Sequence, residues 1–250
     1  MSASDLLPFF EERYGEVDAY LNLLEEMEKA AQSGAPRLEG SGYKITALQQ
    51  KILYSSLYLQ LYNLVEATVS RCMAAITRAA TATDQWQPHQ LNEELQREWV
   101  RSMARTHTEL SPDNRLKFAM QLSDHIVQQL PVSEFIVEAG GGGNWDDEAI
   151  YSIGKRLGCV ISITPSTRQA VKAKLRDGAG PLKLVKIRRN ALAHGSVSFV
   201  DCADGVAVVE LRQMAESVEG YLREVIHCFV RYIETYNFLR LDCRPSGGAP

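Results

Sequence analysis

Most of the chain carries apolar residues that recur every three or four positions between polar ones. This spacing places the apolar side chains on one face of an α-helix. It predicts helices over residues 4–32, 44–81, 89–104, 111–129 and 214–239, with shorter ones beginning after Asn144, after the loop 164–167 and at Pro181. In the second helix Tyr54, Tyr58 and Tyr62 lie every fourth residue along the apolar stripe, which favours core packing over stacking on a ligand. The pattern therefore predicts an all-α bundle of about six to eight helices.

One segment departs from helical spacing. Residues 196–200 and 206–211 alternate apolar and polar side chains on either side of a short loop that ends in Gly205. Alternation is typical of a half-buried strand, and the intervening loop is short enough for a hairpin. We therefore expect one small β-hairpin directly after the helix that begins at Pro181.

Length and composition indicate a single folded unit. The chain has 250 residues, of which 45% are hydrophobic and 23% charged, enough to bury one sizeable core. We expect one domain over residues 1–240, with an insert-like segment at about 84–165. The last ten residues are rich in Pro and Gly, so residues 241–250 are expected to be a disordered tail.

The charge is distributed unevenly. The net charge is −4, yet from Ala149 to Val200 the only acid is Asp177. The same stretch carries ten basic residues: Lys155, Arg156, Arg168, Lys172, Lys174, Arg176, Lys183, Lys186, Arg188 and Arg189. A basic region on an otherwise acidic chain favours an anionic ligand, and a solvated charged face is the simpler interpretation.

The cysteines and the N-terminus indicate where the protein works. Five widely spaced cysteines without a C-x-x-C pair argue against a disulfide framework and a zinc site, and fit a reducing cytoplasm. The first residues lack the basic and apolar regions of a secretory signal, and no apolar stretch approaches the length of a membrane helix. We expect a cytoplasmic protein with no membrane segment, no metal and no cofactor.

The candidate chemistry gathers at the end of the helix that begins at Pro181. Asn190 and His194 are four residues apart, so a helix places them on one face, with Arg189 beside them. Gly195 offers a left-handed end to the helix and leaves His194 in its last turn. A helix C-terminus favours a protonated imidazole. A proton carrier, a permanent cation and an amide are the groups that cleavage of a phosphodiester requires.

The sequence Arg189-Asn190-Ala-Leu-Ala-His194 resembles the Arg-Asn-x-x-x-His signature of the HEPN superfamily, and most closely the MAE-type HEPN ribonucleases. The tyrosine-rich second helix is part of this likeness. So is the stretch 143–158, which is similar to a module inserted ahead of the motif helix in that branch. The resemblance implies a HEPN-like helical bundle that cleaves RNA without a metal, in toxin–antitoxin or antiviral defence. It also implies an acidic partner for the motif on an early core helix, for which Glu66 is the candidate; an exposed position on the polar face is the alternative.

RNA carries its own nucleophile, the ribose 2′-OH, so its cleavage needs no metal-bound water. We expect His194 to transfer the proton and Arg189 to bind the phosphate, with Asn190 orienting either and Arg188 in reserve. The expected products are a 2′,3′-cyclic phosphate and a 5′-hydroxyl. The basic residues expected to contact RNA are Lys172, Arg176, Lys183 and Lys186.

Each motif holds one histidine, and the superfamily pairs two motif helices across a homodimer, so the resemblance implies a dimer with a composite active site. An antitoxin or sensor protein is the expected further partner. Two alternatives remain: an inactive HEPN-like module for dimerisation or for nucleotide or RNA binding, and a motif that only caps its helix. An ordinary hydrolase lacks support, because neither G-x-S-x-G nor H-E-x-x-H occurs.

Overall fold

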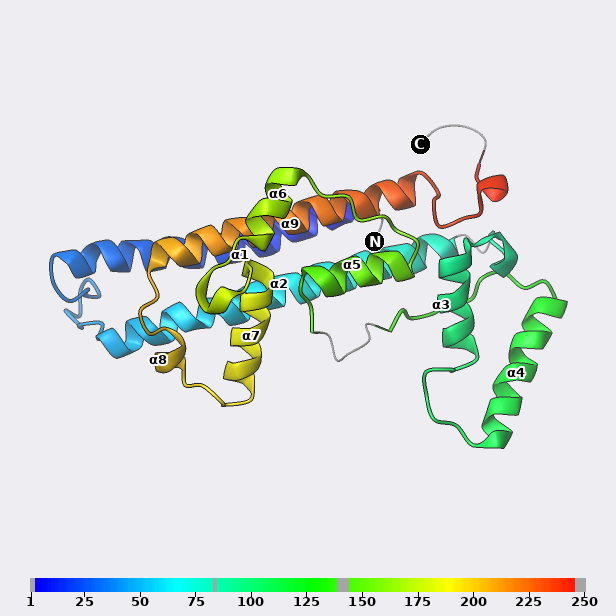
Figure 1. Cartoon of the computed structure of the whole chain (residues 1–250), viewed down its shortest axis with the longest axis horizontal. Coiled ribbons are helices and arrows are strands. Elements are labelled where there is room, and N and C mark those ends of the chain that lie inside the picture. The colour runs from blue at the N-terminus through cyan, green and yellow to red at the C-terminus, as the bar shows by residue number, and fades with distance from the viewer. Residues whose placement is uncertain (1–2, 83–84, 139–143, 246–250) are drawn as a thin grey trace.

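Three long helices form the body of the molecule (Figure 1). The computed structural model of the chain describes residues 3–82, 85–138 and 144–245. The helices α1 (Leu6–Gln32), α2 (Ala47–Thr81) and α9 (Val208–Glu234) each pack against the other two. The bundle is elongated because α2 alone has 35 residues, a length of about 52 Å.

The sequence of α2 explains its length and its central position. Thr46 caps its first turn in a reciprocal capping box with Gln49. The tyrosines Tyr54, Tyr58 and Tyr62 are all buried, which confirms the prediction that they pack in the core. Burial raises the pKa of Tyr58 to about 12, so its hydroxyl stays protonated.

Two arginines of α9 fasten it to α1. Arg212 donates to Asp18 and, at 2.7 Å, to Glu25, and Arg223 pairs with Glu11. The Arg212 side chain is only 17% exposed, so its pairs are better shielded from solvent than ordinary surface salt bridges, whereas Glu11 is exposed. They fix the relative register of the first and last long helices.

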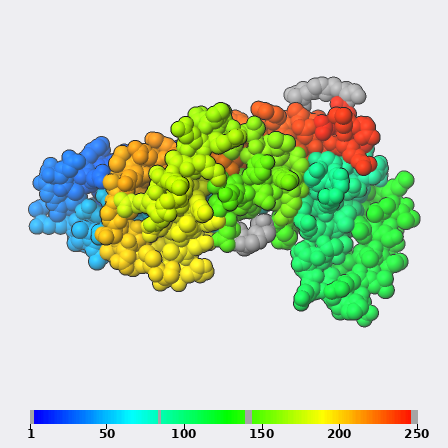
Figure 2. Space-filling model, in the orientation of Figure 1, coloured from blue at the N-terminus to red at the C-terminus, as the bar shows by residue number. Residues whose placement is uncertain are grey.

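The shorter helices lie around this body. They are α3 (Glu93–Met103), α4 (Pro112–Val127), α5 (Asp147–Arg156), α6 (Pro165–Lys172), α7 (Pro181–Ala193) and α8 (Phe199–Cys202). The 3-10 turns are η1 (Ala3–Asp5), η3 (Pro88–Gln90), η5 (Arg176–Gly178) and η6 (Leu241–Cys243). Figure 2 shows α3 and α4 as a lobe at one end of the elongated molecule. Both α7 and α8 pack against α2, and α6 packs against α9.

The predicted β-hairpin is wrong. The described residues contain no strand pair, only the isolated bridges between Arg37 and Lys44 and between Leu91 and Leu239. The Ser198 hydroxyl accepts a hydrogen bond from the Asp201 amide and caps α8 instead. Beyond the loop, buried Val208 and Leu211 begin the apolar stripe of α9, so the short alternation was the start of a helical period.

Four of the five cysteines are buried and only Cys243 is partly exposed. Burial raises the pKa of the Cys159 thiol to about 12 and also raises those of Cys72 and Cys202. In the part of the chain that the structure describes, no helix is long and apolar enough to span a membrane. Of the predicted tail, Leu241–Cys243 forms a 3-10 turn and residues 246–250 lie outside the described residues.

Candidate functional site

The motif lies on α7, which crosses α2 (Figure 1). Its N-cap is Gly180, where an added Cβ would come within 2.2 Å of the Val171 carbonyl oxygen. Glycine therefore lets the beginning of α7 approach the end of α6 closely. At the other end His194 is the C-cap and Gly195 follows with a φ of +68°, the left-handed conformation predicted from the sequence.

Arg189 is held against α2 by three side chains. Its guanidinium carbon lies 4.1 Å from the centre of the Tyr62 ring, a cation–π contact. One Nη donates to Asn190 Oδ1 at 2.8 Å, and the other lies 3.7 Å from Glu66 Oε2. The structure thus brings together Arg189, Asn190 and the acid that the resemblance suggested. The Arg189 side chain is 29% exposed, so it is oriented but still accessible.

Asn190 links α7 to the segment before α5. Its Nδ2 donates to Asn144 Oδ1 at 2.9 Å. Because the Arg189 guanidinium can only donate, the Asn190 oxygen faces Arg189 and its nitrogen faces Asn144. The expected helix begins later than predicted, at Asp147 and not directly after Asn144. Asp146, not Asn144, therefore caps α5, and its side chain accepts from the Ala149 amide at 2.9 Å.

The cap of α5 is also tied to α7. Lys186 forms an ion pair with the carboxylate of Asp146, which is almost fully buried. Burial would raise the pKa of Asp146, but hydrogen bonds from Lys186 and from the Ala149 amide outweigh burial and lower it below its ordinary value. Two contacts, Asp146 with Lys186 and Asn144 with Asn190, therefore fix the start of α5 along the motif helix.

His194 lies at the open end of the site. Its amide donates to the Asn190 carbonyl at 3.0 Å, and its side chain is exposed. Within the described residues its imidazole makes no hydrogen bond or ion pair. The ring is therefore accessible from solvent, one turn beyond Asn190 on the helix.

The remaining basic residues named from the sequence are dispersed. Arg188 pairs with Asp177 at 2.6 Å, and Arg176 pairs with Glu210 at 2.9 Å, both away from the Glu66 contact. Lys172 lies 2.6 Å from Asp147 at the start of α5, and Lys183 is exposed. The structure therefore places Lys172, Lys183 and Lys186 towards α5 and the N-terminal half of α7.

Sequence reasoning missed two members of the site. Tyr62 supplies the ring beneath Arg189, and Asn144 supplies the acceptor for Asn190. Tyr62 could have been found, because it lies four residues before Glu66 and so shares a helix face with it. Asn144 gives no such signal, since its contact joins segments 46 residues apart.

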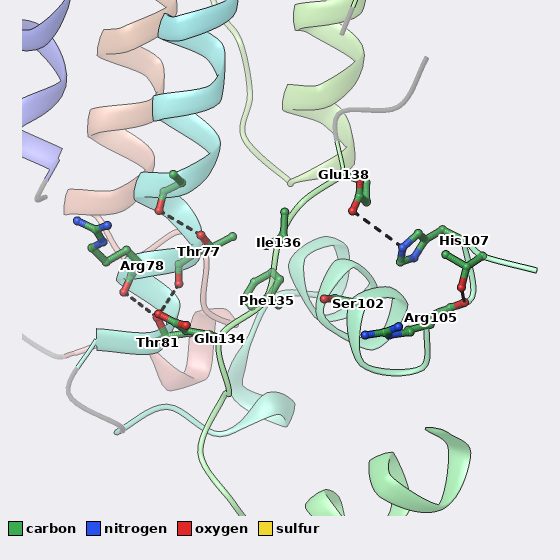
Figure 3. Close-up of a pocket in the computed structure, with 12 residues that line it drawn as sticks. Thr77, Arg78, Thr81, Ser102, Arg105, His107, Glu134, Phe135, Ile136 and Glu138 are labelled. Atoms are coloured by element: carbon green, nitrogen blue, oxygen red, sulfur yellow. Dashed lines mark hydrogen bonds and ion pairs between the residues drawn. The ribbon is translucent and has the colours of Figure 1, made fainter. Parts of the chain in front are cut away.

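A cavity of about 580 Å³ lies elsewhere. Figure 3 shows it between the C-terminal end of α2 and the segment 134–138, with Arg78, Arg105 and His107 on its walls. Arg78 is twelve residues beyond Glu66 on α2, about 18 Å along the helix. His107 faces Glu138 at 4.0 Å there, and no motif residue lines the cavity. Among the described residues no cluster of three His, Cys, Asp or Glu side chains is arranged to hold a metal ion.

The all-helical bundle with an Arg-Asn-x-x-x-His helix packed across its core defines a HEPN-type domain. The sequence model of the family described as HEPN_MAE_28990/-like HEPN matches residues 2–238, and the chain belongs to that family. No curated protein and no solved structure matches the chain significantly.

Proposed function

We propose that the protein is a metal-independent endoribonuclease whose active site is the C-terminal end of α7. One observation carries the proposal: Arg189 is fixed over Tyr62 beside Glu66, while His194, in the next turn, is open to solvent. A cation with a forked set of donors and an accessible imidazole on one helix end match the two needs of phosphodiester transesterification.

In the proposed reaction Arg189 binds two non-bridging oxygens of the scissile phosphate. The ribose 2′-oxygen bonds to phosphorus as its proton leaves to a base, and the bond from phosphorus to the 5′-oxygen breaks as that oxygen takes a proton. His194 transfers one of these protons, a role worth about 100- to 10,000-fold in rate. The products are a 2′,3′-cyclic phosphate and a 5′-hydroxyl.

Asn190 acts by holding Arg189 in place, and Glu66 orders the same guanidinium from α2. Arg188 would be a second, less important contact to the phosphate, although it forms an ion pair with Asp177 in the free protein. The RNA is expected to lie over Lys183 and Lys186, with Lys172 and Arg176 further along the strand.

The second proton transfer requires a second acid or base. A homodimer that pairs two motif helices would supply the partner's copy of the histidine, so we include a composite active site in the proposal. We place this ribonuclease in the cytoplasm and in toxin–antitoxin or antiviral defence, because an unregulated ribonuclease would harm its host. An antitoxin or a sensor protein would then control it.

A second candidate function is an inactive HEPN domain that binds RNA or nucleotides or mediates dimerisation. It is favoured by the engagement of Arg189 with Asn190 and Glu66, an arrangement that also suits a purely structural arginine. The two candidate functions predict different effects of removing the His194 imidazole: the ribonuclease would lose RNA cleavage, whereas the binding module would have no cleavage to lose.

The test compares the wild type with His194→Ala on total RNA in the presence of EDTA, with the cleaved ends mapped. His227→Ala is the matched control, since His227 is an exposed histidine on α9. We expect the wild type and the control to leave cyclic phosphates and His194→Ala to lose at least 100-fold in rate. If no protein cleaves, but Arg189→Ala weakens RNA binding, the binding module is correct.

A further inference from the structure

An apolar pocket lies beside the proposed active site, between α5, α6 and α9. It encloses about 420 Å³, within the range of pockets for small ligands. Its walls are Ile161, Ile163, Val171 and Tyr221. Tyr221 is buried, and its hydroxyl donates to the Asp147 carbonyl at 3.3 Å, so this wall is fixed. An apolar slot of this size fits a planar ring.

Two contacts link the surroundings of the pocket to the motif helix. Asn144 contacts Asn190, and Asp147, three residues later, lies on the rim of the pocket. Three residues span at most about 11 Å, so the rim is close to the motif contact. The wall residue Val171 carries the carbonyl against which Gly180 packs at the beginning of α7.

The rim of the pocket carries an aromatic side chain that can stack on a nucleobase and polar groups that can hydrogen-bond to the edge of a nucleobase. Tyr151 is 59% exposed although it is a large aromatic side chain. The Glu148 side chain is 80% exposed and can accept hydrogen bonds, since Lys172 lies 3.8 Å from it and is held more closely, at 2.6 Å, by Asp147. Arg168 adds an exposed cation to the same rim, where a flanking phosphate would lie, and Lys172 lies beside the two carboxylates.

We propose that this pocket is a nucleobase subsite for a nucleotide of single-stranded RNA adjacent to the scissile phosphate; the assignment of that phosphate rests on the proposed function. The base enters between the apolar walls and stacks on Tyr151, and the carboxylate of Glu148 accepts from its exocyclic amino group. Uracil carries no amino group, so the subsite prefers cytosine, adenine and guanine to uracil. An apolar peptide side chain would fill the slot but would leave the exposed Arg168 without an anion, whereas Lys172 is already paired with Asp147. RNA is therefore the better occupant.

The binding test uses hexanucleotides of A, C, G or U with 2′-O-methyl riboses, which lack the nucleophile and remain intact. We expect the uracil hexamer to bind most weakly to the wild type. Tyr151→Ala should weaken the binding of the other three about 5- to 100-fold, as the loss of one stacked base does. Arg168→Gln should weaken all four by a similar factor, because a phosphate contact does not read the base.

The matched control is Tyr43→Ala, which removes a tyrosine that is 51% exposed in the connection between α1 and α2. Equal binding by Tyr151→Ala and Tyr43→Ala, or equal binding of the four hexamers to the wild type, would overturn the subsite. Either result leaves the ribonuclease proposal untouched, since cleavage of total RNA is measured separately. Conversely, base-dependent binding that Tyr151→Ala abolishes would support the subsite even if the wild type cleaves nothing.

Discussion

At the scale of single residues, the main feature is that Arg189 already has two polar partners before any ligand arrives. Glu66 lies 3.7 Å from one of its nitrogens and Asn190 occupies another. The carboxylate and an incoming phosphate must therefore share or exchange the same guanidinium. Glu66 is 45% exposed, so this exchange takes place in contact with solvent.

We predict that Glu66→Gln binds uncleavable RNA about 2- to 5-fold more tightly at low salt, because one negative charge near the phosphate is removed. The free energy of unfolding should change by less than about 0.5 kcal/mol, since the pair is long and exposed. Fluorescence anisotropy and thermal melting measure the two effects. Weaker binding would instead show that Glu66 acts mainly by ordering Arg189.

Asp146 gives a prediction for how the free energy of unfolding depends on pH. Asp146→Asn keeps a good helix cap but loses the ion pair with Lys186, and should cost about 1–3 kcal/mol at pH 7. The folded-state pKa of Asp146 lies below its ordinary value, so the wild-type contribution is complete above about pH 4 and is lost as the pH falls through the folded-state pKa. Urea unfolding of both proteins between pH 7 and pH 3 measures the difference, and a constant difference would refute this account.

The residues of the site were only partly predictable from the sequence. The motif itself was visible because its spacing of four is a property of one helix. The contact of Glu66 with Arg189 was suggested by the resemblance and not by the residue pattern. The contact of Asn190 with Asn144 depends on how the start of α5 lies against α7, which the pattern of neither segment encodes.

At the scale of elements, the spacing of apolar residues predicted most of the helices and gave one wrong element, the β-hairpin. The long apolar faces of α1, α2 and α9 were predicted correctly, because apolar residues that recur every three or four positions over several turns do not fit a β-strand. The runs 196–200 and 206–211 are each too short to distinguish the alternation of a strand from the first turn of a helix. There the Ser198 cap and the burial of Val208 and Leu211 determined the outcome.

The close approach of α6 and α7 gives a prediction at this scale. Gly180→Ala places a methyl group within 2.2 Å of the Val171 carbonyl, and should destabilise the fold by about 1–3 kcal/mol as α7 moves outward. Gly15→Ala is the matched control, because Gly15 lies within α1 with nothing within 4 Å of an added Cβ. That control should gain about 0.5–1 kcal/mol. Equal unfolding free energies for the two variants would contradict the packing argument.

At the scale of the whole molecule, the three long helices place the motif near the middle of an elongated body and the α3–α4 lobe at one end (Figure 2). The motif helix lies across α2 instead of parallel to it, so its C-terminal end reaches the edge of the bundle (Figure 1). This position at an edge suits the proposed active site, which two chains would complete together.

The proposed composite site predicts that activity depends on protein concentration. Light scattering should give twice the mass of one 27.9 kDa chain at micromolar concentration. Specific activity should fall on dilution as dimers dissociate, while His227→Ala behaves as the wild type does. A monomeric mass with full, dilution-independent activity would leave one motif sufficient for catalysis.

The burial of four cysteines has a practical consequence for observing that assembly. Cys72, Cys159 and Cys202 are held as inert thiols by their raised pKa values, and Cys228 is also buried, so maleimide dyes should react at Cys243 alone. Peptide mapping after labelling verifies this, and Cys243→Ser should take up no dye. Each copy would then carry one fluorophore close to the end of α9, without any engineered cysteine. Energy transfer between donor- and acceptor-labelled copies would report the pairing of two native chains in solution, and its loss on dilution would give their dissociation constant.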